Sequence, residues 1–81
     1  MSAREAFENL GFNYVIEDKY GIEYLDSDVK YGREGVRSIY VDKEGNITAT
    51  QGIYDGETYL ELSKDMLVAV LIQLREFDIK L

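Results

Sequence analysis

The sequence predicts an α+β fold, in which an antiparallel β-meander of four to five strands is flanked by an N-terminal and a C-terminal helix packed on one face. Three observations predict it: a capped helical segment near each end of the chain, short β-rich runs between them, and glycines at the breaks. Glycine supplies the positive φ angles that tight turns need. A chain of 81 residues builds one hydrophobic core, so we expect a single domain over residues 1–81.

The first helix is expected over about residues 3 to 10. Ser2 and Glu5 form an S-x-x-E capping box, and apolar residues then follow on one helical face. Gly11 stands where a left-handed cap ends a helix, and Phe12 is placed to fold back on the last turn.

Five β-rich runs are expected to form the strands, at residues 12–17, 22–26, 36–41, 47–51 and 58–62. The clearest hairpin joins the third and fourth runs, where residues 42–45 predict a type I turn with Gly45 at the left-handed bulge position. Residues 27–35 are expected to form the longest loop and residues 51–57 the second longest. Loops of this kind carry binding surfaces on a rigid scaffold.

The last helix is expected from Lys64 to about Phe77, with Ser63 as its cap. Met66 at the third position leaves the capping box incomplete. An apolar stripe on this helix is expected to pack across the sheet, formed by Met66, Leu67, Val70, Leu71, Leu74 and Phe77. Val68 and Ile72 fall outside the stripe. Either the first helix covers them, which we favour because layers bury apolar faces against each other, or they form a homodimer interface.

The residue types that are absent limit the chemistry. With no Cys and no His, the chain has neither a thiolate nor an imidazole to act as nucleophile, general base or zinc ligand. No glycine-rich segment has the spacing of a phosphate-binding loop. Asp26 and Asp28 resemble the start of a calcium loop, but Tyr31 and Arg37 stand where its Gly and Glu are required. We therefore expect no enzyme, no cofactor and no metal.

Charge is the strongest compositional bias. Sixteen acidic and nine basic residues give a formal net charge of -7. Direct nucleic acid binding is not expected, because it needs clustered Lys and Arg. The charge either keeps the protein soluble or imitates nucleic acid in a basic groove of a partner. Neither a signal peptide nor a membrane span fits, so we expect a cytoplasmic protein without membrane partners.

Tyrosine is abundant, with seven in the chain. Tyr is a common strand residue, half-buried with its hydroxyl at the rim, and also a preferred interface anchor. If Leu60 and Leu62 point at the helices, alternation sends their neighbours to the open face of the sheet. We therefore predict a partner-binding surface formed by Tyr24, Tyr40, Tyr59 and Glu61.

Several stretches of the chain resemble the small uncharacterised proteins of phages and prophages of Gram-positive bacteria. These are the opening AREAFENLGF, the KYGIEY strand, the IYVDKEGNI hairpin and the closing LSKDMLVAVLIQLREF helix. The resemblance is one of layout and extends along most of the chain. It implies a non-enzymatic accessory protein of the host cytoplasm, in a class that includes inhibitors of host defence, but it assigns no functional residues.

Two functional hypotheses follow. The first is a protein that binds and inhibits or adapts a host macromolecule, such as an anti-CRISPR-like or other anti-defence inhibitor, whose partner is a host protein or ribonucleoprotein with a basic groove. The alternative is a structural or assembly homodimer with Val68 and Ile72 of the last helix at its interface.

Overall fold

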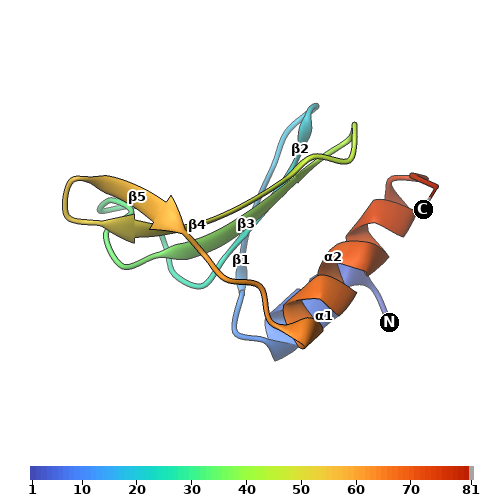
Figure 1. The fold of residues 1–81 in the computed structure, drawn as a ribbon, viewed down its shortest axis with the longest axis horizontal. Coiled ribbons are helices and arrows are strands. Elements are labelled where there is room, and N and C mark those ends of the chain that lie inside the picture. The colour runs from blue at the N-terminus through green and yellow to red at the C-terminus, as the bar shows by residue number, and fades with distance from the viewer. Residues whose placement is uncertain (81) are drawn as a thin grey trace.

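The computed structural model describes residues 1–80. Its elements are α1 (Ala3–Asn9), β1 (Tyr14–Glu17), β2 (Gly21–Leu25), β3 (Arg37–Asp42), β4 (Ile47–Ile53), β5 (Gly56–Tyr59) and α2 (Lys64–Glu76). The strands form one antiparallel sheet in the order β1-β2-β3-β4-β5, and both helices lie on the same side of it (Figure 1). The predicted α+β meander with its helices on one face is confirmed.

The start and end of α1 follow the predicted signals. The Ser2 hydroxyl accepts a hydrogen bond from the Glu5 amide at 3.1 Å, and the Glu5 carboxylate accepts one from the Ser2 amide at 3.2 Å. Gly11 adopts a φ of 92°, and the amide of Phe12 returns to the carbonyl of Phe7 at 2.9 Å. The Phe12 ring meets the Phe7 ring edge to face. Phe12 therefore belongs to the helix cap, and β1 begins two residues later than predicted.

The cap of α2 is more complete than predicted. The Ser63 hydroxyl accepts a hydrogen bond from the Met66 amide at 3.2 Å, and the Ser63 amide points at the Met66 sulfur at 3.4 Å. The expectation of an incomplete capping box was wrong, because a thioether serves as a weak acceptor in place of a carboxylate.

The two helices run antiparallel and are tied together at one end. The Glu76 carboxylate, in the last turn of α2, accepts a hydrogen bond from the amide of Ala3, the first residue of α1, at 2.6 Å. Ala3 and Ala69 are fully buried, and their small side chains let the elements of the core approach closely. The helices thus form one layer over the sheet.

The core lies between this helical layer and β2 and β3. Cross-strand pairs place Tyr24 beside Ile39 and Ile22 beside Val41, and all four side chains are buried. The Phe7 ring stacks on the Tyr24 ring with centroids 3.9 Å apart. At the far end, Ile79 packs under Gly45 of the β3–β4 turn, whose φ of 94° matches the predicted turn.

The apolar stripe predicted on α2 was wrong in part. Leu67 and Leu71 are 47% and 41% exposed, whereas Ala69 and Gln73 are buried in their place. The helix is rotated towards Ala69 and Gln73 because Gln73 accepts a hydrogen bond from Tyr24 inside the core. Four residues of the predicted stripe do pack in or against the core: Met66, Val70, Leu74 and Phe77.

The connections also differ from the prediction in one place. Residues 51–57 do not form a loop. β4 continues to Ile53 and β5 begins at Gly56, which leaves only Tyr54 and Asp55 as the turn. The paired strand residues satisfy backbone groups that a loop would leave to water. The connection between β2 and β3, residues 26–36, is the longest, as predicted.

Candidate functional site

The face of the sheet opposite the helices is the candidate interaction surface. We call it the open face. The strand registers place on it the side chains of Tyr14, Ile16, Glu23, Leu25, Ser38, Tyr40, Thr48, Thr50, Glu57 and Tyr59. Each strand contributes every second residue, because side chains alternate between the two faces.

The 26–36 loop covers part of the open face. Leu25 and Ser38 are 0% and 4% exposed although they face away from the helices, and Val36 of the loop is buried with them. The loop docks at Gly52, whose amide and carbonyl bond to Val36 and Gly35 at 2.9 Å each. A Cβ on Gly52 would lie 1.6 Å from the Arg33 carbonyl oxygen. Only glycine therefore allows the loop to lie this close to β4.

Two ion pairs hold the loop in place. The Arg33 guanidinium donates two hydrogen bonds to the Glu23 carboxylate, at 2.9 and 3.0 Å. This pairing lowers the pKa of Glu23 and raises the pKa of Arg33. At the base of the loop, Asp26 accepts hydrogen bonds from the backbone amide and Nε of Arg37, at 2.9 and 2.8 Å, and this pair joins the two ends of the loop. Tyr31 lies between Asp26 and Arg33.

The predicted partner-binding residues do not all share one surface. Tyr24 was wrongly placed on the open face: it is 1% exposed and faces the helices, because it pairs with the core residue Ile39. Tyr40 lies on the open face. Tyr59 lies there too, 91% exposed, and Glu61 is also exposed. Tyr40 and Tyr59 are separated by β4, so the structure does not join them into one cluster.

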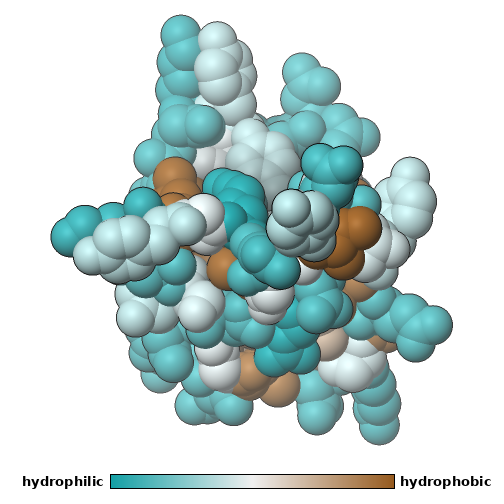
Figure 2. Space-filling view, turned by 90° about the vertical axis from the view of Figure 1, so that its left-hand side faces the viewer, coloured by the Kyte–Doolittle hydropathy of each residue, from teal (hydrophilic) through white to brown (hydrophobic). Residues whose placement is uncertain are grey.

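The three most exposed tyrosines are carried by the β4–β5 hairpin and by the 26–36 loop, which docks on Gly52 of this hairpin. Tyr31 of the loop is 93% exposed, and Tyr54 and Tyr59 of the hairpin are 90% and 91% exposed. We call these three tyrosines with Asp55 and Glu57 the hairpin end. Figure 2, which views the molecule from this side, shows mostly hydrophilic and intermediate residues, with the hydrophobic ones in separate patches.

The predicted surface did not include Tyr31 or Tyr54. A signal for both was present in the sequence: Tyr31 precedes Gly32, and Tyr54 lies two residues before Gly56. A large side chain at the tip of a turn has few neighbours to bury it.

A hollow of about 430 Å³ adjoins Tyr59 on the open face. Thr48 and Thr50 of β4 and Glu57, Thr58 and Tyr59 of β5 line it. It combines an aromatic wall, hydroxyl groups and one carboxylate. This combination suits the aliphatic stem and charged head of a Lys or Arg side chain from a partner.

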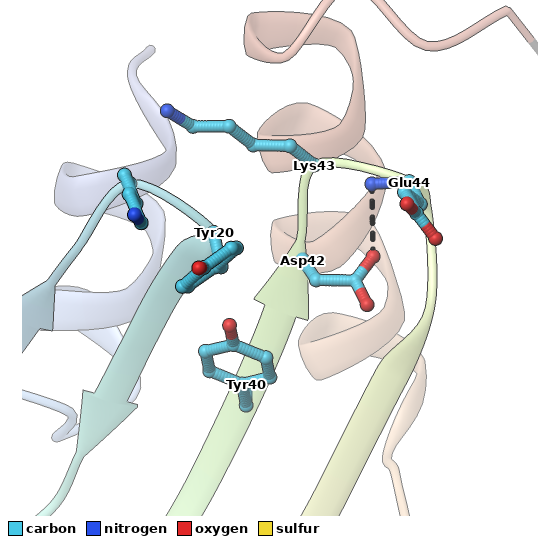
Figure 3. A pocket seen from close by; sticks show the side chains of 6 residues that line it. Tyr20, Tyr40, Asp42, Lys43 and Glu44 are labelled. Carbon is cyan, nitrogen blue, oxygen red and sulfur yellow. Dashed lines mark hydrogen bonds between the residues drawn. The ribbon is translucent and has the colours of Figure 1, made fainter.

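A second hollow of about 430 Å³ lies between the β1–β2 and β3–β4 turns (Figure 3). Tyr40 points its hydroxyl towards Tyr20, and Lys43 extends above them. The Tyr40 hydroxyl fills the space over Gly21, and burial, followed by the nearby carboxylates, raises the pKa of Tyr40. Asp42 is used by the turn itself, where backbone amides and Asn46 lower the pKa of its carboxyl. The polar groups that line this hollow therefore mainly stabilise the β1–β2 and β3–β4 turns.

The two residues predicted at a dimer interface are in different environments. Ile72 is partly buried and packs against the core. Val68 is 48% exposed and borders a shallow hollow with Ala6 and Leu10 of α1. The exposed apolar side chains of α2 are therefore Leu67, Val68 and Leu71.

Two features are absent from residues 1–80. No three carboxylates stand close enough together to hold a metal ion. Neither helix is long and apolar enough to cross a membrane.

Comparison of the chain with protein-family models, with curated proteins and with solved structures found no match. The resemblance to phage and prophage proteins therefore stays a prediction.

Proposed function

We propose that this protein binds a basic surface of a partner protein through the hairpin end and the adjoining part of the open face. One observation carries the proposal: Tyr31, Tyr54 and Tyr59, on the β4–β5 hairpin and on the loop that docks at Gly52, are each at least 90% exposed.

Exposed tyrosines suit an interface because each ring brings a large contact area and has only two torsions to fix on binding. Tyr is also among the residues that dominate binding energies in interfaces. Tyr31 and Tyr54 sit in turns that contain glycine, a combination typical of antibody binding loops. The strands and the two ion pairs of the 26–36 loop hold these turns in fixed positions, which reduces the entropy lost on binding.

Charge specifies the partner further. The protein carries a formal net charge of -7, and Asp55, Glu57 and Glu61 accompany the tyrosines of the hairpin. Such a surface attracts a basic partner and repels nucleic acid. In the setting that the resemblance implies, the partner is a host protein or ribonucleoprotein with a basic groove, and binding inhibits it in the manner of an anti-defence protein.

The test is photo-crosslinking followed by affinity measurement. A photoreactive amino acid at position 59 is expected to capture the partner, whereas one at position 20, in the β1–β2 turn, is not. Replacing a central tyrosine costs about 2 kcal/mol or more in such interfaces, or about 30-fold in Kd. We expect that effect for Tyr54→Ala or Tyr59→Ala. Tyr20→Ala, a change at another exposed tyrosine, should alter Kd less than about threefold.

The salt dependence tests the chemistry of the partner. Raising the salt from about 50 to about 500 mM should weaken the complex at least about tenfold, because the attraction between exposed charges is screened. Binding that is independent of salt, or that is indifferent to both tyrosine substitutions, would contradict the proposal.

A second candidate function is assembly through α2, favoured by the exposure of Leu67, Val68 and Leu71 at 41–48%. An antiparallel pair of α2 helices would, however, bring Lys64 of one copy near Arg75 of the other, and like charges repel. Sedimentation at high concentration decides the matter. A dimer that Leu67→Lys with Leu71→Lys dissociates would support assembly, and a wild-type monomer would exclude it.

A further inference from the structure

Alternate backbone groups of β5 face away from the sheet. The amide and carbonyl of Gly52 bond to residues of the 26–36 loop, so Glu57, opposite Gly52 in register, has no ladder bond to β4. The Leu60 amide donates to the Ala49 carbonyl at 3.0 Å. Because an antiparallel ladder alternates, the backbone groups of Glu57 and Tyr59 point outwards together.

This edge of the sheet is open to pairing. Within residues 1–80, no strand lies beyond β5 in the sheet order, and all four β5 residues are exposed. Natural sheets protect such edges with charged side chains, Pro, bulges or very short strands. β5 has four residues and carries Glu57 but no Lys, Pro or bulge, so its protection is a negative charge that a basic strand would neutralise. The edge thus presents two outward donor and acceptor pairs, at Glu57 and Tyr59, to an added strand.

The side chains along this edge determine which strand fits. Glu57 and Tyr59 share one side of β5, because side chains alternate. Glu61 follows them, exposed between Leu60 and Leu62, which both pack against the core. An antiparallel second copy centred on Tyr59 would bring each Glu57 opposite a Glu61, and one centred on Glu57 would oppose two Glu57 carboxylates. Like charges directly opposite are destabilising, so the edge disfavours a second copy.

We infer that the β5 edge binds an extended basic segment of the partner, which adds to the sheet as a further strand. Its Lys or Arg residues lie opposite Glu57 and Glu61, and an aromatic or β-branched residue lies opposite Tyr59. This inference rests on the proposed function, and it specifies that the partner binds through an extended segment. The Arg33 guanidinium donates its two hydrogen bonds to Glu23, so Glu57 keeps hydrogen-bonding capacity for a cationic side chain.

The β1 edge, on the other side of the sheet, supplies a matched control. The backbone amide of Asp18 donates a hydrogen bond to the carbonyl of Gly21 at 3.0 Å, so the backbone groups of Val15 and Glu17 face outwards there. The β1 edge has one acidic residue, Glu17, where the β5 edge has Glu57 and Glu61. We therefore expect the β1 edge to bind a basic strand more weakly.

The test uses a synthetic peptide with the central sequence Lys-Thr-Val-Thr-Lys. Its two lysines are four positions apart, on either side of the valine. Both lysines then lie on one side of the strand. A control peptide of the same composition has its lysines three positions apart, on opposite sides. We expect the first peptide to bind at least about tenfold tighter than the control, and Glu57→Gln with Glu61→Gln to remove this difference. Hydrogen exchange at the amides of Glu57 and Tyr59 should slow on binding.

A second variant tests the backbone directly. N-methylation of the Tyr59 amide, introduced by chemical synthesis, removes an outward donor and keeps the ring, and it should weaken the first peptide at least about tenfold. N-methylation of Val15 should leave its affinity unchanged.

Each outcome decides the inference. If the peptides bind equally, if neither binds at millimolar concentration, or if exchange at Glu57 and Tyr59 is unaltered in the complex, strand addition is wrong. Failure of the proposed function would be seen separately, as a natural partner whose affinity is indifferent to Tyr54→Ala and Tyr59→Ala.

Discussion

The hydroxyl of Tyr24 donates a hydrogen bond to the side-chain oxygen of Gln73, which joins the middle of β2 to the buried side of α2. The two residues are 1% and 3% exposed. A buried polar pair is favourable only when both groups are satisfied. The pair therefore helps to fix the rotation of α2 on the sheet, and with it the exposure of Leu67 and Leu71.

Removal of either partner should destabilise the fold by leaving the other polar group buried without a hydrogen bond. We expect Tyr24→Phe and Gln73→Leu each to lower the free energy of unfolding by about 1–3 kcal/mol. The double variant should be more stable than the sum of the two single effects implies, because neither polar group remains. Urea unfolding of the four proteins measures this coupling. Additive effects would show that the pair contributes no specific interaction.

The same tyrosine should make stability depend on high pH. Burial, followed by the nearby Glu76 carboxylate, raises the pKa of Tyr24 from 10.0 to about 12. The folded state then holds the proton more tightly than the unfolded state. This contribution to stability is complete below pH 10 and is lost as the pH rises towards 12.

We expect the free energy of unfolding to fall by up to about 3 kcal/mol across this range. Denaturant unfolding at pH 9 and near pH 11.5 measures the change. Tyr24→Phe should reduce the fall, and an equal fall in that variant would assign it to other groups.

The difference between the predicted and observed core arises from this pair. The position of both helices, their caps and the five strands could be predicted, because capping boxes, glycines and β-rich runs are local signals. The face of the sheet on which Tyr24 lies could not be predicted from the sequence. In β2, Ile22 and Tyr24 alternate with Glu23 and Leu25, so either side of the strand offers an apolar residue. Only the register with β3 selects one side.

The same limit applies to the candidate site. Tyr59 could be placed on the open face because alternation from Leu60 is short and unambiguous. The 26–36 loop, which carries Tyr31, is brought to the β4–β5 hairpin only by docking at Gly52. That contact connects residues far apart in the chain, and no local pattern encodes it.

Gly52→Ala should release the loop from the sheet. The added methyl group would lie 1.6 Å from the Arg33 carbonyl oxygen, so the backbone of the loop must move. We expect stability to fall by about 1–3 kcal/mol, together with the exposure of Leu25. Limited proteolysis should then cut residues 27–35 faster than in the wild type. Thr48→Ala, an exposed position on the same strand, serves as the control, and a loop as protected in Gly52→Ala as in the wild type would contradict the docking.

The C-terminal ends of the two helices offer a matched pair of substitutions. In α1 and α2 alike, the chain turns at a residue of positive φ, and the next amide bonds back to the final turn: Phe12 to Phe7, and Ile79 to Leu74. In α1 the turning residue is Gly11, with φ 92°, but in α2 it is Asp78, with φ 60°. A left-handed conformation is costly for residues with a Cβ, and an acidic side chain is unfavourable at a helix C-terminus.

Asp78→Gly should therefore raise the free energy of unfolding by about 0.5–1 kcal/mol, and Gly11→Ala should lower it by about 1 kcal/mol. For a chain of this length, 1 kcal/mol corresponds to a shift in Tm of about 4–8 °C, which thermal unfolding detects. Asp78→Asn separates the two causes, because Asn removes the charge but tolerates the same backbone conformation. If Asp78→Asn stabilises as much as Asp78→Gly, charge at the end of α2 is the dominant cost. If it has no effect, the cost lies in the backbone conformation.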